Sequence, residues 1–469
     1  MNRGFSSETS PSRVWVADFA LLIVRGIARF ADPVRHTIWW GLVILSFQVN
    51  ASLGWAGENS TTYDIVYLGS QSGERTLTPP PASVPVTGTT HVEWFGGGLP
   101  WWQWSQLTGN WSGVRPELET NGLTFAGRFT TDTSVGLSSG TGQRGSQRGL
   151  LDLNLTFDPE PLLGIHGGTF FAQYFYRYGP NGSDDIGDVQ GYDNIDAGQL
   201  NQAEEIWYEQ KFAHDHLRLK AGQVDANAEF DNLSAAAGFI NSSAGFSPTL
   251  LNFPTYPNPA LSANLFVYPT EWFYSGAGIY TDNLRDLSAY GFHHPYLIGE
   301  AGLKHPGNGR FGPGLVAAGF WHDTAAVSRF DGGSQDGTSG YYVLAEQQVW
   351  KQKPGAADDS SGVSVFAQYG SANPEVSPVA HHVGVGISAT GLLPQRSQDA
   401  LGLYWSSAEL SRASGSGFTR NESSLEGYYQ CQVTPFFALK PDLQWINHPG
   451  GQASPDAAWV ATLRVIIYF

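Results

Sequence analysis

Cysteine is almost absent from this chain of 469 residues, since Cys431 is the only one. A single thiol cannot form an internal disulfide, and it cannot supply the several thiolates of a zinc or iron–sulfur site. Cys431 alternates with Leu425, Tyr429 and Val433, a pattern that predicts a small residue on an apolar strand face rather than a reactive thiol. We therefore expect no disulfide, no metal site and no cofactor.

Charge is also scarce, and the basic sign is the scarcer one. Only 14% of the residues are charged, and 25 Lys and Arg stand against 42 Asp and Glu, which gives a net charge of −17. Nucleic acid is excluded as a partner, because phosphate binding requires a basic surface.

Apolar runs long enough for a transmembrane helix are missing as well. The best candidate, residues 38–47, is too short to span a bilayer, and the mean hydropathy of −0.22 is too polar for a helical membrane protein. The chain is rich instead in glycine (57) and in aromatic residues (16 Trp, 20 Tyr and 27 Phe), with one methionine. This composition indicates a chain rich in β-strands and turns.

The last thirteen residues, AAWVATLRVIIYF (457–469), alternate with period two. Trp459, Leu463 and Phe469 belong to an entirely apolar face, whereas Arg464 lies on the other face. In a soluble sandwich the apolar face would be core; in a membrane barrel it would face lipid, with Arg464 in a wet lumen. The stretch is long enough for a tilted membrane strand of about 9–11 residues. A terminal aromatic residue in strand register resembles the assembly signal of bacterial outer-membrane barrels.

Similar alternating segments fill the chain from Leu123 onward, and connections between them are alternately short and long. This arrangement predicts an all-β fold: a transmembrane antiparallel barrel of about 16 strands, with short periplasmic turns and long outer loops. A lumen of this width is a water channel unless it is plugged. The longest loop, 226–262, carries Ala, Asn, Phe and Pro rather than charge, so we expect it to fold into the lumen and narrow the pore. The predicted strands begin near Leu123, Arg148, Thr169, Ala203, Leu217, Ala263, Phe273, Tyr296, Gly314, Gly340, Gly362, His381, Ala400, Ser423, Phe436 and Ala457.

The segments before the barrel predict export. Residues 1–56 are expected to be a cleaved signal peptide, cut after Ala56 or alternatively after Ala51. Its n-region is unusually long, so either translation begins at Val34 or the chain has a true long leader. Residues 57–106 form a Pro- and Trp-rich periplasmic segment, residues 107–122 hold a short periplasmic helix, and residues 123–469 are the barrel domain.

Three motifs and the last residue resemble the carbohydrate-selective outer-membrane porins, the OprB-like family. The motifs are LTGNWSGVR (107–115), AGQVDANAEF (221–230) and NSSAGF (241–246), and the last residue is Phe469. Asn110 and Ser112 stand where the family usually carries an acid and a glycine. The resemblance, which covers 107–469, implies a non-enzymatic channel in the outer membrane of a Gram-negative bacterium. It also implies passive uptake of small sugars through a charged, aromatic-lined constriction. Lipid, lipopolysaccharide and the barrel-assembly machinery are the implied partners, and a homo-oligomer remains open.

Strand parity selects the candidate residues of the sugar path. A sugar offers hydroxyl groups to charged side chains and C–H groups to an aromatic face. Arg128 and Arg464, each about six residues from the periplasmic rim, are expected side by side, with Asp152 as the nearest acid partner and with Glu205, Trp207 and Glu209 across the pore. Parity also places Arg218 and Lys220 inside and Leu153 on the lipid face. The alternatives are a general or ion-selective porin and a soluble exported β-rich sugar-binding protein. The residues predicted to line the lumen are Arg128, Asp132, Asp152, Arg177, Glu205, Trp207, Glu209, Asp225, Glu229 and Arg464.

Overall fold

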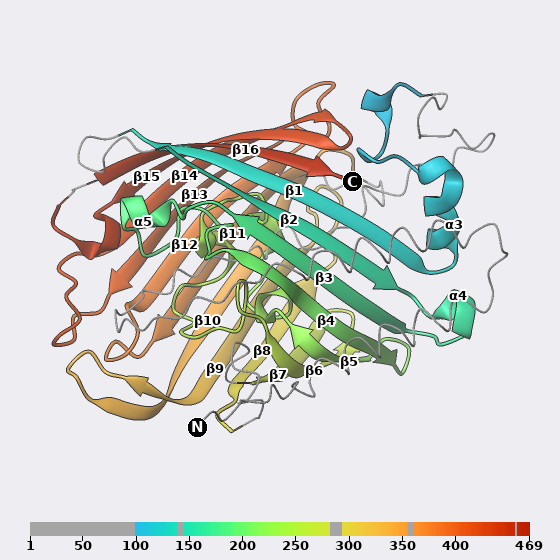
Figure 1. Ribbon diagram of the computed structural model, residues 1–469. Helices are drawn as coiled ribbons and strands as arrows, with labels where there is room; N and C mark the ends of the chain where they lie inside the picture. Colours follow the sequence, from blue (N-terminus) through green and yellow to red (C-terminus); the bar gives the residue numbers. More distant parts are fainter. Residues whose placement is uncertain (1–98, 138–144, 282–292, 355–360, 455–456) are drawn as a thin grey trace, which may run out of the picture. The chain divides into compact units, whose positions relative to one another are not determined.

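The protein folds into a closed barrel of sixteen antiparallel strands (Figure 1). The computed structural model describes residues 99–137, 145–281, 293–354, 361–454 and 457–469. Each strand pairs with the next along the chain, and β16 closes the ring on β1. The strands are β1 (Leu123–Gly136), β2 (Gly145–Phe157), β3 (Gly168–Tyr178), β4 (Leu200–Phe212), β5 (Leu217–Val224), β6 (Ala260–Thr270), β7 (Phe273–Tyr280), β8 (Tyr296–His305), β9 (Gly314–Ser328), β10 (Ser334–Lys351), β11 (Gly362–Ala372), β12 (Val379–Thr390), β13 (Ala400–Leu410), β14 (Glu422–Thr434), β15 (Phe437–Asn447) and β16 (Ala457–Tyr468).

The predicted strands are confirmed in number and nearly in position. Only β10 begins more than three residues from its predicted start, at Ser334 rather than Gly340. The difference arises at its outer end, where β10 and β9 extend their pairing past a bulge between Asp336 and Thr338. Glycine is common around this bulge, so the alternation of side chains is hard to recognise there.

The barrel wall is apolar outside, and most of its charged side chains face inside. On β16, Trp459 and Leu463 are 43% and 47% exposed, whereas Arg464 is 1% exposed. A water-soluble fold shows the reverse, because it removes apolar side chains from the surface. The outward apolar face and inward Arg464 therefore confirm the strand register expected from the sequence.

Short helices and 3-10 turns lie at both ends of the barrel and in the connection between β5 and β6. Helices α3 and α4 lie at the end that holds the short turns and the C-terminus, and α5 lies at the opposite end (Figure 1). None of the helices in the described ranges is long and apolar enough to cross a membrane. The helices are α3 (Val114–Thr120), α4 (Glu160–Leu163), α5 (Ser183–Ile186) and α6 (Ser242–Gly245), with 3-10 turns η5 (Trp101–Gln103), η6 (Trp111–Gly113), η7 (Ala226–Ala228), η8 (Ser234–Ala236) and η10 (Pro449–Gly451).

The segment before β1 is fixed to the closing strand. The amide of Leu107 donates to the carbonyl of Tyr468 at 2.9 Å. Helix α3 lies in the segment expected to hold a short helix and ends before Gly122, whose φ of +85° favours glycine. A Cβ at Gly122 would also lie 2.1 Å from the carbonyl oxygen of Asp158, so the turn requires glycine.

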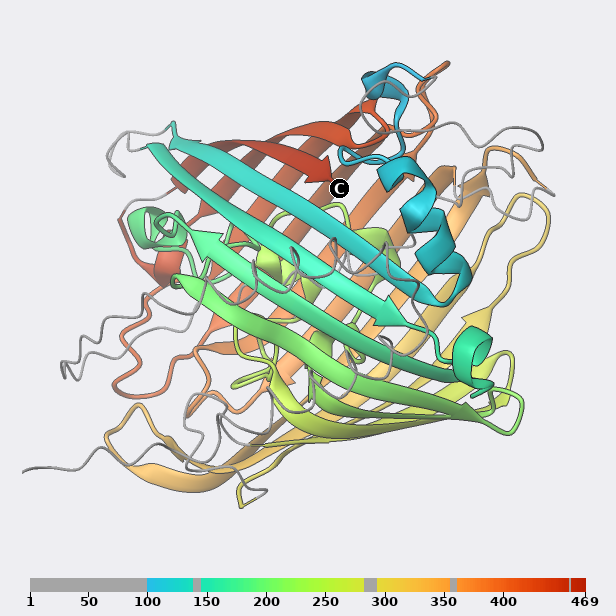
Figure 2. The ribbon, with the colours of Figure 1, turned by 45° about the vertical axis from the view of Figure 1, so that its right-hand side comes forward.

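The long connection between β5 and β6 folds into the barrel, as expected. We call residues 225–259 the inner loop; in Figures 1 and 2 this segment lies within the ring of strands. Phe230, Phe239 and Phe246 of this loop are at most 2% exposed and belong to the main apolar cluster of the molecule. Phe239 packs edge-on against Tyr428 of β14, with ring centroids 5.0 Å apart. The alanine and phenylalanine side chains of this loop therefore fill the bore.

Candidate functional site

Carboxylates of the wall hold the inner loop by its backbone. Glu205 on β4 accepts from the amide of Asp225 at 2.9 Å, and Glu300 on β8 accepts from the amide of Asp231 at 3.0 Å. Glu346 on β10 and Glu426 on β14 do the same further along the loop: Glu346 accepts from Ala235, and Glu426 accepts from Ile240 and Asn241. Because these strands are spread around the ring, the inner loop is fastened across the bore rather than along one side.

A second connection, residues 179–199 between β3 and β4, also lies against the interior, which the sequence reasoning missed. We call it the minor loop. Its Asp193 accepts from Arg148 at 2.6 Å and lies 3.3 Å from Arg464, and all three side chains are at most 1% exposed. The amide of Asn194 in the minor loop donates to the carbonyl of Ile240 in the inner loop at 2.7 Å. The two loops therefore form one insert.

Burial and the neighbouring arginines have opposite effects on the pKa of the minor-loop acids. Burial favours the neutral form of Asp193, but Arg148 and Arg464 outweigh it and hold the pKa of this carboxyl below its usual value. Burial raises the pKa of Asp196 to about 6, even though Arg148 lies 2.8 Å away. Asp193 is therefore an ionised partner that the two guanidiniums share.

A charged cluster with an aromatic face lies on β4 and β5, beside the start of the inner loop. Glu229 accepts from Arg218 at 2.5 Å and from Lys220 at 2.6 Å, and Glu209 lies 3.1 Å from Arg218. The Lys220 ammonium lies 3.8 Å from the ring centroid of Trp207. We call these five residues the Trp207 cluster. Unlike the arginines near the minor loop, the Arg218 side chain keeps 17% of its exposure and Trp207 is half-buried.

The predicted path residues fall into three groups. Glu209, Glu229 and Trp207 meet in the Trp207 cluster. Glu205 and Asp225 are hydrogen bonded to each other at the root of the inner loop. The remaining ones are ion pairs or loop supports: Arg128 with Asp152 at 3.5 Å, Asp132 with Arg464 at 2.7 Å, and Arg177, which donates to Ile195 and Gly179 of the minor loop.

The prediction that Arg128 and Arg464 lie side by side is wrong. In the β1–β16 pairing Arg464 is level with Asp132, and Arg128 is level with Tyr468. Counting residues from the rim on each strand ignored the stagger of closing strands in a barrel. The acid partner expected for Arg128, Asp152, is correct, since the two are level in the β1–β2 pairing.

The position expected for the β4 side chains is also wrong. They were placed across the pore from β1, but β4 is only the third strand along the ring from it. Glu205, Trp207 and Glu209 therefore lie on the same side of the barrel as Arg128.

Sequence reasoning left some interior residues out of the site. Arg218 and Lys220 were assigned to the interior by parity but not to the path. Asp193 and Asp196 lie in the minor loop, where no alternation exists, and Arg148 stood at the uncertain start of a strand. The acid-rich composition of the minor loop, opposite a wall with inward arginines, was the one available signal.

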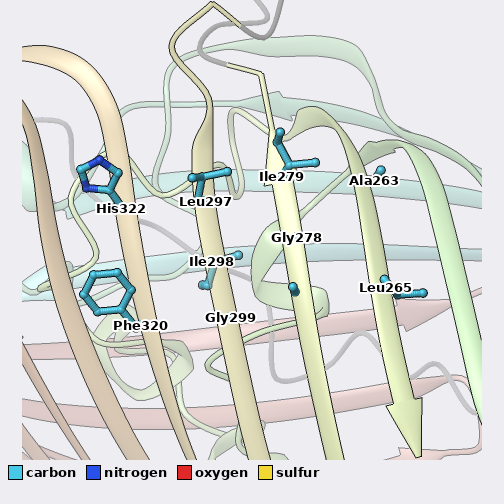
Figure 3. Close-up of a pocket in the computed structure, with 10 residues that line it drawn as sticks. Ala263, Leu265, Gly278, Ile279, Leu297, Ile298, Gly299, Phe320 and His322 are labelled. Carbon is cyan, nitrogen blue, oxygen red and sulfur yellow. The ribbon is translucent and has the colours of Figure 1, made fainter.

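The outer surface carries a separate hollow that is not part of this interior site. It has a volume of about 610 Å³ and crosses β6 to β9 (Figure 3). Leu265, Leu297 and Phe320, which line it, are 38–57% exposed and occupy the outward positions of their strands. The small side chain of Ala263 and the absence of one at Gly299 leave the space between them.

Comparison with known proteins identifies the barrel. The family model described as carbohydrate-selective porin, OprB family, matches residues 143–469. The chain belongs to this family. Porin B of Pseudomonas aeruginosa is 23% identical to it over 431 residues, covering 77% of this chain and 91% of the relative.

Solved structures of a relative share the fold. The high-pH structure of Pseudomonas putida OprB has a TM-score of 0.70 at 22% identity, covering 78% of this chain and 99% of that one. The low-pH structure of the same protein has a TM-score of 0.54 at 19% identity.

Family membership establishes the general function. The protein is a sugar porin of the Gram-negative outer membrane, and the outward apolar face of its strands is the surface that meets lipid. The soluble alternative is thereby removed. Porins of this family are non-enzymatic in kind.

Proposed function

We propose that small sugars cross the barrel past the Trp207 cluster: Trp207, Glu209, Arg218, Lys220 and Glu229. The observation that supports this most is the contact of Lys220 with the Trp207 ring at 3.8 Å, beside the carboxylate of Glu229. An aromatic face next to charged donors and acceptors offers a sugar both kinds of contact it needs. Opposite charges in close pairs also leave little net attraction for an ion of either sign.

The other predicted residues shape this path indirectly. Arg177 and Arg464 hold the minor loop, Glu205 and Asp225 hold the root of the inner loop, and the pairs Arg128–Asp152 and Asp132–Arg464 set the charge of the wall. We infer that lipid and lipopolysaccharide contact the outer wall. We also infer that the barrel-assembly machinery recognises Phe469. A second copy of the chain is a further candidate partner.

Sugar swelling of liposomes that contain the purified protein tests the proposal. Glucose should enter faster than neutral, non-sugar solutes of the same size, and Lys220→Gln with Glu229→Gln should remove most of the difference. A general porin would pass all these solutes in order of size alone, and an ion-selective porin would show a strong reversal potential in a salt gradient. Either result would reject sugar selectivity at this cluster.

A further inference from the structure

A second group of aromatic and cationic side chains lies inside the wall, on β6 to β8. The Lys304 ammonium is 4.9 Å from the ring centroid of Tyr274 and 5.5 Å from that of Tyr268. The two tyrosine rings are 6.3 Å apart on neighbouring strands. We call Tyr268, Tyr274 and Lys304 the Lys304 patch. Lys304 faces inward, because Leu303 beside it is 54% exposed on the outer wall.

The patch adjoins the Trp207 cluster on the short-turn side. The guanidinium of Arg218 lies 4.3 Å from the ring centroid of Phe266, and this ring is 6.4 Å from that of Tyr268. Strand β6 runs from the inner loop toward its short turn, so Tyr268 lies nearer to that end than Phe266. A solute that leaves the Trp207 cluster in this direction meets the Lys304 patch next.

Lys304 differs from most inward cations in having no carboxylate within 4 Å in the described ranges, although Glu300 on the same strand interacts with it electrostatically. Lys440 also differs from Lys304, because it is buried and donates to the carbonyl of Gly238. The inward cations that do have a carboxylate within 3.7 Å are Arg128, Arg148, Arg177, Arg218, Lys220 and Arg464.

Glu300 and Glu346, the acids that act electrostatically on Tyr274, are already engaged. Glu300 accepts from the hydroxyls of Tyr274 and Tyr342 at 2.6 and 2.7 Å and from the amide of Asp231. Glu346 accepts from the amide of Ala235. Lys304 itself is exposed, so its charge remains available to a solute in the channel.

We infer that the Lys304 patch is a second subsite, which binds the carboxylate of an acidic monosaccharide such as an aldonate or a uronate. The ammonium, held over two aromatic faces, forms a charge-assisted hydrogen bond with the carboxylate. The half-buried ring of Tyr268 receives the C–H groups of the sugar backbone. This inference depends on the proposed passage of sugars through the Trp207 cluster, and it extends that passage to acidic sugars.

Block of ion current through single channels in a planar bilayer tests the subsite, with gluconate and glucose as probes. In the native protein gluconate should block at a lower concentration than glucose. In Lys304→Gln the half-blocking concentration of gluconate should rise by roughly fivefold or more, the scale of one charge-assisted bond, while glucose changes by less than about twofold. Lys304→Arg should retain the preference, and Tyr268→Ala should weaken block by both solutes.

Lys211→Gln is the matched control. Lys211 is an exposed lysine at the short-turn end of β4. Its replacement should leave the preference for gluconate intact. An equal loss in both glutamine variants would mean that general charge at the mouth attracts gluconate, and the subsite would be rejected. An unchanged gluconate block in Lys304→Gln, at native single-channel conductance, would also reject it. Failure of glucose to block or permeate the native channel would instead overturn the proposed function.

Discussion

Trp207 is the single side chain on which the proposed selectivity depends most. It stacks on Phe171 with ring centroids 4.9 Å apart and carries Lys220 on its ring. We expect Trp207→Ala to weaken block of the ion current by glucose by about 1 kcal/mol, which is roughly fivefold in half-blocking concentration. Single-channel recording in a planar bilayer measures the change.

Leu153→Ala is the control for the assignment of Trp207 to the lumen and of Leu153 to the lipid face. Leu153 is level with Gly127 and Tyr174 on the neighbouring strands and contributes to an outward groove, so its loss should leave the current and the block unchanged. An altered current in Leu153→Ala together with a native current in Trp207→Ala would mean that the inward and outward faces are exchanged.

Asp193 is the residue that balances the buried charge of the minor loop. In Asp193→Asn, Arg148 and Arg464 lose an ionised partner at 2.6 and 3.3 Å in a fully buried place. Removing one partner of a buried ion pair costs about 3–5 kcal/mol, and Asp132 and Asp196 offset part of that cost. Thermal unfolding in detergent should therefore show a clearly lower midpoint.

The comparison variant is Asp331→Asn, which breaks an exposed pair with Arg329 at 3.0 Å. It should leave the midpoint unchanged, because exposed ion pairs contribute little. Equal midpoints for the native protein and Asp193→Asn would show that the minor loop is not held by this charge.

At the scale of elements, the stability of the inner loop depends on pH. Burial raises the pKa of Asp231 to about 7, although the amide of Ser247 donates to its carboxylate. Between pH 4 and pH 7 the folded form binds a proton that the unfolded chain has released, so the free energy of unfolding falls as the pH rises. Asp231→Asn should remove this penalty, roughly 2–4 kcal/mol at pH 8, and change little at pH 4.

Hydrogen exchange of the inner-loop amides at the two pH values measures this difference. The native loop should exchange faster at pH 8, after correction for intrinsic rates, and the variant should not. A variant with the same pH dependence as the native protein would assign the effect to another group.

The strands could be predicted from the sequence, whereas the insert could be predicted only in part. Strand alternation survives because lipid on one side and water on the other impose period two on every segment. The inner loop was detectable from its low charge. The minor loop carries five aspartates, and this composition is equally typical of a solvated outer loop. They are Asp184, Asp185, Asp188, Asp193 and Asp196. Its position is decided by Arg148 and Arg464, which are distant in sequence.

The terminal strand gives a test of assembly. Phe469 exchanges two backbone hydrogen bonds with Gly127, and its ring occupies the space where a Cβ of residue 127 would be. Phe469→Ser should lower the yield of folded barrel in the outer membrane, mainly by slowing assembly, since the lost apolar burial is at most a few kcal/mol. Quantitative immunoblotting of membrane fractions measures the yield. A native yield would show that the last residue is not an assembly signal.

At the scale of the whole molecule, export is the remaining expectation. Residues 1–56 lie outside the described residues. The predicted signal peptide is therefore tested by determining the N-terminus of the mature protein. Intact-mass analysis of the protein purified from outer membranes should place its first residue at Gly57 or at Ser52. A mature protein that retains Trp39 and Trp40 would exclude the signal peptide.

The fastening of the inner loop has a consequence for how such a channel can evolve. Glu205, Glu300, Glu346 and Glu426 all accept from backbone amides of the loop, and every residue except proline has one. Substitutions along the loop can therefore alter the solute preference while the same four anchors keep the segment in place. A change in the available solutes can be met by exchanging exposed side chains of the loop, because the four anchors bind its backbone amides and not those side chains.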